Sequence, residues 1–132
     1  MRTKRIDNKD ALSLLEEANN QMIFTIKMPI SVESSFNIVR NVYECFRMLG
    51  DALLISKGLE STDHIEPIKA IIEIKDINTK RSLNVLDNMR IMRHNINYNG
   101  YSPTIKETED VIDFAKLCFN ETYLYLKKKV EK

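Results

Sequence analysis

The chain has 132 residues and a mass of 15.4 kDa, a length that predicts a single domain with a hydrophobic core of its own. Three glycines and three prolines are too few for the many tight turns of a β-sandwich or β-barrel, so long helices are favoured. The formal net charge of +1 provides no overall attraction to nucleic acid or to a membrane surface, and binding of either kind would need a local patch of charge.

A first helix is predicted from apolar residues that recur at helical spacing after residue 10. We expect residues 1–8 to be frayed and Asp7 or Asn8 to cap this helix. Pro29 would end it, because the residue before a proline is biased away from helical backbone angles. The segment 22–26 also fits a strand, but no neighbouring segment offers it a partner.

A second helix carries an apolar stripe over about five turns. Ser31 is its expected N-cap, and Gly58 stands where a residue in the left-handed conformation should follow its end. Gly50 lies within the stripe. Because a glycine in a helix interior costs about 1 kcal/mol relative to alanine, we expect Gly50 to allow close packing of another helix.

Two further helices begin with capping boxes, in which a short polar side chain and an acid three residues later satisfy free backbone N–H groups. Asp63 and Glu66 form the first box, which opens a short third helix. Thr104 and Glu107 form the second, which opens the last helix, and an apolar stripe carries that helix to Val130.

The fourth helix is predicted to run from about Lys80 to Asn95, with a loop following over residues 98–103. Arg93 lies seven residues after Leu86 and therefore on the apolar face of this helix. An arginine at that position needs a partner, because an unpaired buried charge is costly.

These elements together predict an all-α protein. Four long helices and one short helix, joined by short connections, form an antiparallel up-and-down bundle of four to five helices without a sheet. The bundle would be one domain covering residues 1–132.

The sequence contains no pattern for a metal site, a signal peptide or a membrane span. No apolar run approaches the ~20 residues of a transmembrane helix, and the polar first ten residues lack an apolar signal core. Cys45 and Cys118 are far apart, with no CxxC and no nearby histidine pair. We therefore expect two buried thiols, no metal, no cofactor and a cytoplasmic location.

The residues capable of chemistry gather between Arg90 and Tyr101, where two arginines, one histidine, three asparagines and two tyrosines lie within twelve residues. Arginine binds phosphate through paired hydrogen bonds and offsets developing negative charge. Histidine or tyrosine can move the proton of a ribose 2′-hydroxyl. The alternative is a hydrogen-bond cluster that caps the helix and holds the loop.

Most of the chain resembles the HEPN family, which comprises small helical-bundle domains of prokaryotic nucleotide-binding and toxin systems. Residues 43–64 (YECFRMLGDALLISKGLESTDH) resemble the second helix of the family and the turn after it. Residues 89–104 (MRIMRHNINYNGYSPT) resemble the helix that carries the family motif, and residues 109–126 (EDVIDFAKLCFNETYLYL) resemble the terminal helix.

The family motif is an arginine, a polar residue, three further residues and a catalytic histidine. Arg93 matches the arginine and His94 matches the polar residue, whereas Tyr98 occupies the histidine position. Tyrosine has an ordinary pKa near 10 and is a poor general base at neutral pH. The variant resembles a subgroup of the family whose activity is unassigned, and the tyrosine favours binding over cleavage.

The resemblance implies a homodimeric nucleotide- or RNA-binding or regulatory module that acts with a small nucleotidyltransferase in a toxin–antitoxin-like or stress system, away from membranes. The residues expected to bind phosphate are Arg90, Arg93, Asn95 and Tyr101. One alternative is a metal-independent endoribonuclease that uses Arg93 with His94 or Tyr98. A further alternative is a purely structural dimer.

Overall fold

The computed structural model describes residues 1–131 as a helical bundle with one very small sheet. The elements in chain order are β1 (Arg2–Thr3), α1 (Asn8–Thr25), α2 (Ser35–Ser56), β2 (Leu59–Glu60), α3 (Ile65–Ile72), α4 (Val85–Asn99) and α5 (Ile105–Glu131). The predicted all-α bundle is confirmed, whereas the expectation that it has no sheet is wrong, because β1 and β2 pair.

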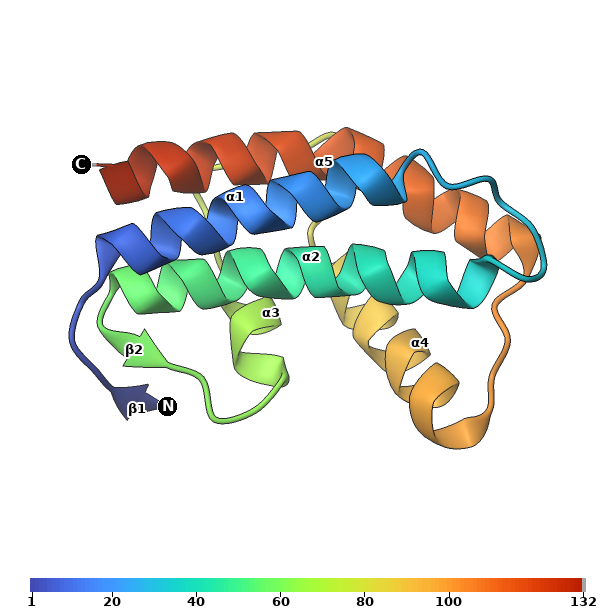
Figure 1. Ribbon diagram of the computed structural model, residues 1–132, viewed down its shortest axis with the longest axis horizontal. Helices are drawn as coiled ribbons and strands as arrows, with labels where there is room; N and C mark the ends of the chain where they lie inside the picture. The colour runs from blue at the N-terminus through green and yellow to red at the C-terminus, as the bar shows by residue number, and fades with distance from the viewer. Residues whose placement is uncertain (132) are drawn as a thin grey trace.

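The three long helices α1, α2 and α5 pack against one another, and α3 and α4 pack against α2 from below (Figure 1). Helices α1, α2, α4 and α5 alternate in direction, so α5 runs parallel to α2 and antiparallel to α1. Aromatic rings pack between α2 and α5: the centroid of Phe46 lies 5.3 Å from that of Phe114 and 5.2 Å from that of Phe119. Burial of large apolar side chains on this scale is the main source of stability in such a bundle.

The N-terminus differs from the expectation of a frayed segment. Residues Arg2–Thr3 pair in antiparallel fashion with Leu59–Glu60, and the Lys4 N–H donates to the Gly58 carbonyl at 2.8 Å. The pairing partner is more than fifty residues away in the sequence, so no local pattern could indicate it. Residues 22–26, for which a strand was the alternative, continue α1 and its C-cap.

Helix caps agree closely with the sequence. Asp7 caps α1 by accepting from the Asp10 N–H at 2.9 Å. At the start of α5, the Glu107 N–H donates to Thr104 Oγ1 at 3.0 Å and the Thr104 N–H donates to Glu107 Oε1 at 2.9 Å, a complete capping box. Asp63 accepts from two backbone N–H groups at the start of α3.

The expected N-cap of α2, Ser31, lies one turn too early. Its hydroxyl accepts from the Ser34 N–H at 3.2 Å, and the Ser34 hydroxyl accepts from the Ser31 N–H at 3.0 Å. These reciprocal bonds close a separate turn, after which α2 begins at Ser35. A cap signal in sequence identifies the turn but not whether the helix continues through it.

Helix α4 is displaced along the chain from its expected range of Lys80 to Asn95. It begins at Val85 and continues to Asn99, where Gly100 ends it in the left-handed conformation with φ 66°. The consequence is that Tyr98 lies on the helix, one turn after His94, and not in a loop.

The connection into α4 is held against α5 by Arg81. Its guanidinium lies 3.0 Å from Asp110 Oδ1 and 3.1 Å from Asp113 Oδ2, and 5.7 Å from the centroid of the Phe114 ring. This combination of paired hydrogen bonds and cation–π contact ties the chain to α5 just before α4 begins.

Close contact between α2 and α3 depends on Gly50, as its position predicts. A Cβ atom at this residue would lie 2.1 Å from the carbonyl oxygen of Pro67. Gly58 adopts φ 74° after the end of α2, also as expected.

Candidate functional site

The structure separates the predicted phosphate-binding residues onto two sides of α4. Positions three and four apart share a helix face, whereas positions two apart do not, so Arg93 and Asn95 point in different directions. Asn95 lines a groove together with Tyr101 and Glu107. Arg90 and Arg93 lie toward the opposite flank, where they approach α2.

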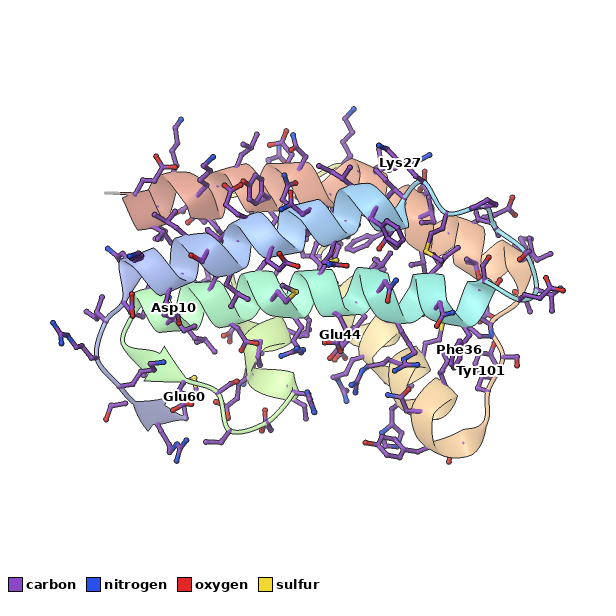
Figure 2. All side chains as sticks on the ribbon, viewed as in Figure 1. Asp10, Lys27, Phe36, Glu44, Glu60 and Tyr101 are labelled. Atoms are coloured by element: carbon purple, nitrogen blue, oxygen red, sulfur yellow. The ribbon has the colours of Figure 1, made fainter. Side chains whose placement is uncertain are left out.

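Asn95 and Tyr101 tie the end of α4 to α5. The Asn95 carbonyl accepts from the Tyr101 N–H at 3.1 Å, and its side-chain oxygen accepts from Asn99 at 2.9 Å. The Tyr101 hydroxyl donates to Glu107, and this bond raises the pKa of Tyr101. Figure 2 shows Tyr101 near the end of the molecule opposite the two termini. These contacts match the helix-end cluster that the sequence left open as an alternative.

Arg93 finds the partner it needs on α2, within the same chain. Its Nε lies 3.2 Å from Glu44 Oε1, and its guanidinium carbon lies 5.6 Å from the centroid of the Tyr43 ring. Figure 2 shows Glu44 on the side of α2 that faces α3 and α4. The charge of Arg93 is therefore compensated without a second copy of the chain.

Glu44 belongs to a row of charged residues along α2. Arg47 donates to Glu44 and to Asp51, both at 2.7 Å, and Ser61 donates to Asp51 at 3.1 Å. Burial raises the pKa of Asp51, although the charge of Arg47 and the Ser61 hydrogen bond act in the opposite direction. Burial likewise raises the pKa of Tyr43, against the nearby arginines, and keeps this hydroxyl protonated.

His94 and Tyr98 form an exposed aromatic pair on the outer side of α4. Their ring centroids are 4.9 Å apart, and Tyr98 is 70% exposed. Arg90 lies one turn before His94 and pairs with Asp87 at 3.1 Å. An exposed aromatic surface beside arginines is suited to stacking with a base while the guanidinium groups bind phosphate.

Sequence reasoning missed the contribution of α2 to this site. Every cationic side chain of α2 and α4 is an arginine, although lysine outnumbers arginine in the chain. Arg40 on α2 lies one turn before Glu44 and makes no ion pair with any residue between 1 and 131. The sequence has no lysine over residues 28–56 or over residues 81–105, and arginine is the residue suited to paired hydrogen bonding with phosphate.

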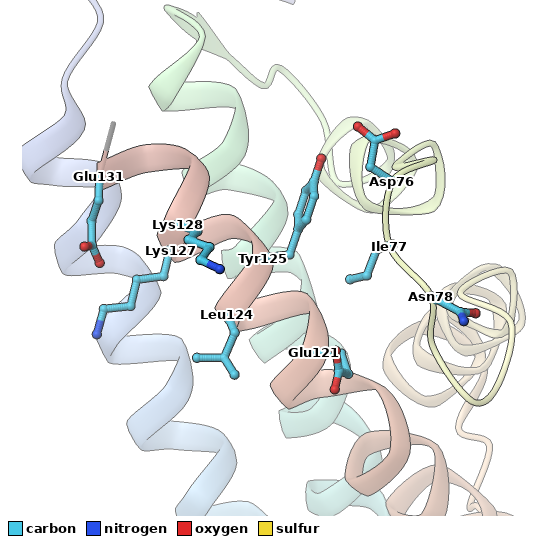
Figure 3. Close-up of a pocket in the computed structure, with 9 residues that line it drawn as sticks. All are labelled: Asp76, Ile77, Asn78, Glu121, Leu124, Tyr125, Lys127, Lys128 and Glu131. Atoms are coloured by element: carbon cyan, nitrogen blue, oxygen red, sulfur yellow. The ribbon is translucent and has the colours of Figure 1, made fainter.

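A further groove lies elsewhere, between the second half of α5 and the connection at residues 76–78 (Figure 3). Its volume is about 550 Å³. Tyr125 points across it toward Asp76, while Leu124 and Lys127 point to the other side of α5. Lys127 pairs with Glu16 at 3.3 Å.

Neither a metal site nor a reactive thiol is formed by the part of the chain that the structure describes. No group of three His, Cys, Asp or Glu side chains is placed to hold a metal ion there. Cys45 and Cys118 are both buried and free, as expected, and burial raises the pKa of Cys45 to about 12. Within residues 1–131, no helix combines the length and apolar character needed to cross a membrane.

No protein-family model, curated protein or solved structure matches the chain.

Proposed function

We propose that the protein is a HEPN-like, homodimeric, cytoplasmic module that binds the phosphate and bases of RNA or a nucleotide along α4. The observation that carries this proposal is the exposed pair of His94 and Tyr98 beside Arg90 and Arg93, on helices whose cations are all arginines. The family resemblance adds a small nucleotidyltransferase as the partner in a toxin–antitoxin-like or stress system.

Stacking of an RNA base on Tyr98 can be tested directly by fluorescence anisotropy of a labelled, mixed-sequence RNA. Base–aromatic stacking contributes roughly 1–3 kcal/mol per base, so Tyr98→Ala should weaken binding about tenfold. Phe24 on α1 is a matched control because it is 63% exposed, close to the 70% of Tyr98. Equal affinity of Tyr98→Ala and Phe24→Ala would contradict the proposal.

An endoribonuclease is the second candidate, favoured by the contact between the His94 and Tyr98 rings. We expect the wild type to bind RNA in EDTA with little or no cleavage, because tyrosine is a poor general base at neutral pH. Tyr98→His restores the family motif and should introduce cleavage, while His94→Ala should leave the low wild-type rate unchanged. Strong wild-type cleavage that requires Tyr98 would establish the ribonuclease instead.

A homodimer is supported by the flank of α4 that faces α5. Four positions on this flank, each about one helical turn from the next, carry no charged side chain: Asn84, Asn88, Ile91 and Asn95. It borders adjoining grooves of about 380 and 420 Å³ with Met92 in both. Interface cores are typically poor in charge and rich in methionine.

Assembly is testable by light scattering at high micromolar concentration. We expect the wild type to have the mass of a dimer, and Ile91→Glu to have that of a monomer, because it places a charge in the buried part of the interface. Ile105→Glu, at a residue of similar exposure on α5, is the control and should remain dimeric. A monomeric wild type would contradict the proposed assembly and leave the RNA test unaffected.

A further inference from the structure

Arg40 is the arginine of α2 and α4 whose charge is not compensated within residues 1–131. The other three arginines of these helices, Arg47, Arg90 and Arg93, lie 2.7, 3.1 and 3.2 Å from a carboxylate oxygen. Arg40 forms no ion pair with any residue of the described chain, and the first turn of α2 carries no acidic side chain. An added anion can therefore bind Arg40 without displacing an acid.

Phe36 presents an aromatic surface beside this charge. The guanidinium carbon of Arg40 lies 5.1 Å from the centroid of the Phe36 ring, and Phe36 is 39% exposed. Guanidinium groups stack on aromatic rings and bind phosphate through paired N–H donors. Exposed aromatic rings in turn stack with the bases of single-stranded RNA. The two side chains together can hold one base and the phosphate next to it.

The Phe36–Arg40 pair lies on the side of α2 that faces α4. Residues 36, 40 and 44 are four apart and share a helix face, and Figure 2 shows Phe36 and Glu44 on the same side of α2. Glu44 in turn lies 3.2 Å from Arg93 on α4. Because Arg93 and Arg47 both compensate the charge of Glu44, this acid does not keep a phosphate chain away from the surface between Arg40 and α4.

The surface from α4 to Phe36 is longer than one nucleotide. At about 1.5 Å per residue, Phe36 lies about 12 Å along α2 from Glu44, and Tyr98 lies about 7.5 Å along α4 from Arg93. A stacked strand advances about 3.4 Å per nucleotide. A ligand that contacts both Phe36 and Tyr98 therefore contains several nucleotides.

We propose that Phe36 and Arg40 form a second RNA subsite on α2, and that the ligand is an RNA strand of several nucleotides and not a free mononucleotide. This inference rests on the proposed RNA binding along α4 and specifies its ligand. One base stacks on the Phe36–Arg40 pair, the adjacent phosphate accepts from the Arg40 guanidinium, and other nucleotides of the same strand reach Tyr98. An open surface of this kind suits a single strand, which binds on stacking platforms.

The first test uses fluorescence anisotropy of two labelled single-stranded RNAs, a dinucleotide and an octanucleotide of the same base composition. The wild type should bind the octanucleotide about tenfold or more tightly than the dinucleotide. Arg40→Ala and Phe36→Ala should each weaken octanucleotide binding about tenfold, the low end of the range for a charged contact or a stacked base. Dinucleotide binding should stay within about twofold, because the subsite on α4 is retained.

The salt dependence of octanucleotide binding separates a phosphate contact from a structural effect. Each phosphate contact on a single strand contributes about 0.7 to the slope of log K against log salt concentration, so Arg40→Ala should reduce the slope by about 0.7. Arg40→Lys keeps the charge and should keep the slope. Arg5→Ala removes an exposed arginine near the far end of α2, where Lys4 bonds to Gly58, and should change neither affinity nor slope.

A second variant at Phe36 guards against a loss of folding. Phe36→Leu retains an apolar side chain but removes the aromatic face, so it should weaken octanucleotide binding as Phe36→Ala does. Circular dichroism should show the helical content of the wild type in every variant.

The proposed subsite is overturned if the wild type binds both RNAs equally, or if Arg40→Ala and Phe36→Leu bind the octanucleotide as the wild type does. An unchanged salt slope in Arg40→Ala likewise overturns the phosphate contact. In each of these cases the site on α4 stands as long as Tyr98→Ala weakens binding. Absence of binding of either RNA by the wild type overturns both proposals.

Discussion

Gly50→Ala should lower the free energy of unfolding by about 3 kcal/mol, at the upper end of the usual cost of overpacking a core. The added methyl group would lie 2.1 Å from the carbonyl oxygen of Pro67 and 2.8 Å from its Cα. These are backbone atoms at the start of α3, so no side-chain rotation relieves the contact. Chemical denaturation followed by circular dichroism measures the change.

Whether Gly50→Ala lowers or raises the free energy of unfolding shows whether α3 packs closely at this residue. Helix propensity alone favours alanine over glycine by about 1 kcal/mol, so a helix without close packing would be stabilised by the same substitution. Asn37→Ala is a suitable control, because Asn37 is an exposed residue of α2 and should change stability by less than about 0.5 kcal/mol. An unchanged or more stable Gly50→Ala protein would show that α3 does not pack against α2 as described.

Arg93→Ala should weaken binding of RNA or nucleotide about 10- to 100-fold. The loss corresponds to one charge-assisted contact with phosphate, worth roughly 1.5–3 kcal/mol. Fluorescence anisotropy of labelled RNA measures it, at a salt concentration held constant because phosphate contacts depend strongly on salt.

Arg93 also supports the fold, so the same variant must be shown to remain folded. Its ion pair with Glu44 is partly exposed, with 19% and 34% of the two side chains accessible, and its loss should cost about 1 kcal/mol. Lys116→Ala removes one exposed positive charge from α5 and should bind RNA as the wild type does. Equal binding by Arg93→Ala and Lys116→Ala would exclude Arg93 from the site.

Local patterns in the sequence predict this protein's helices well. Asp7 and the Thr104–Glu107 box indicated helix starts that the structure contains, because capping depends on side chains within a few residues. The bounds of α4 were wrong at both ends. The connection before it is held by Arg81, which binds acids about thirty residues later, and no local pattern indicates such a contact.

The candidate site depended much more on tertiary structure. The sequence placed Arg93 on an apolar face and required it to have a partner, which was correct. It could not identify Glu44, because the two residues are far apart in the chain and meet only where α4 crosses α2. Nor could it separate Asn95 from Arg93, since closeness in the chain does not place two side chains on the same side of a helix.

The sequence by itself determined the fold class, most helix caps and the need of Arg93 for a partner. Periodicity and capping depend on residues that are close together in the chain, and the need for a partner follows from the position of Arg93 on an apolar helix face, whichever residue supplies the partner. The tertiary structure decided which acid compensates Arg93, which residues share its surface and which only hold the end of α4. Those pairings depend on how α2, α4 and α5 cross, and the crossing is set by long-range packing such as that of Gly50 against Pro67.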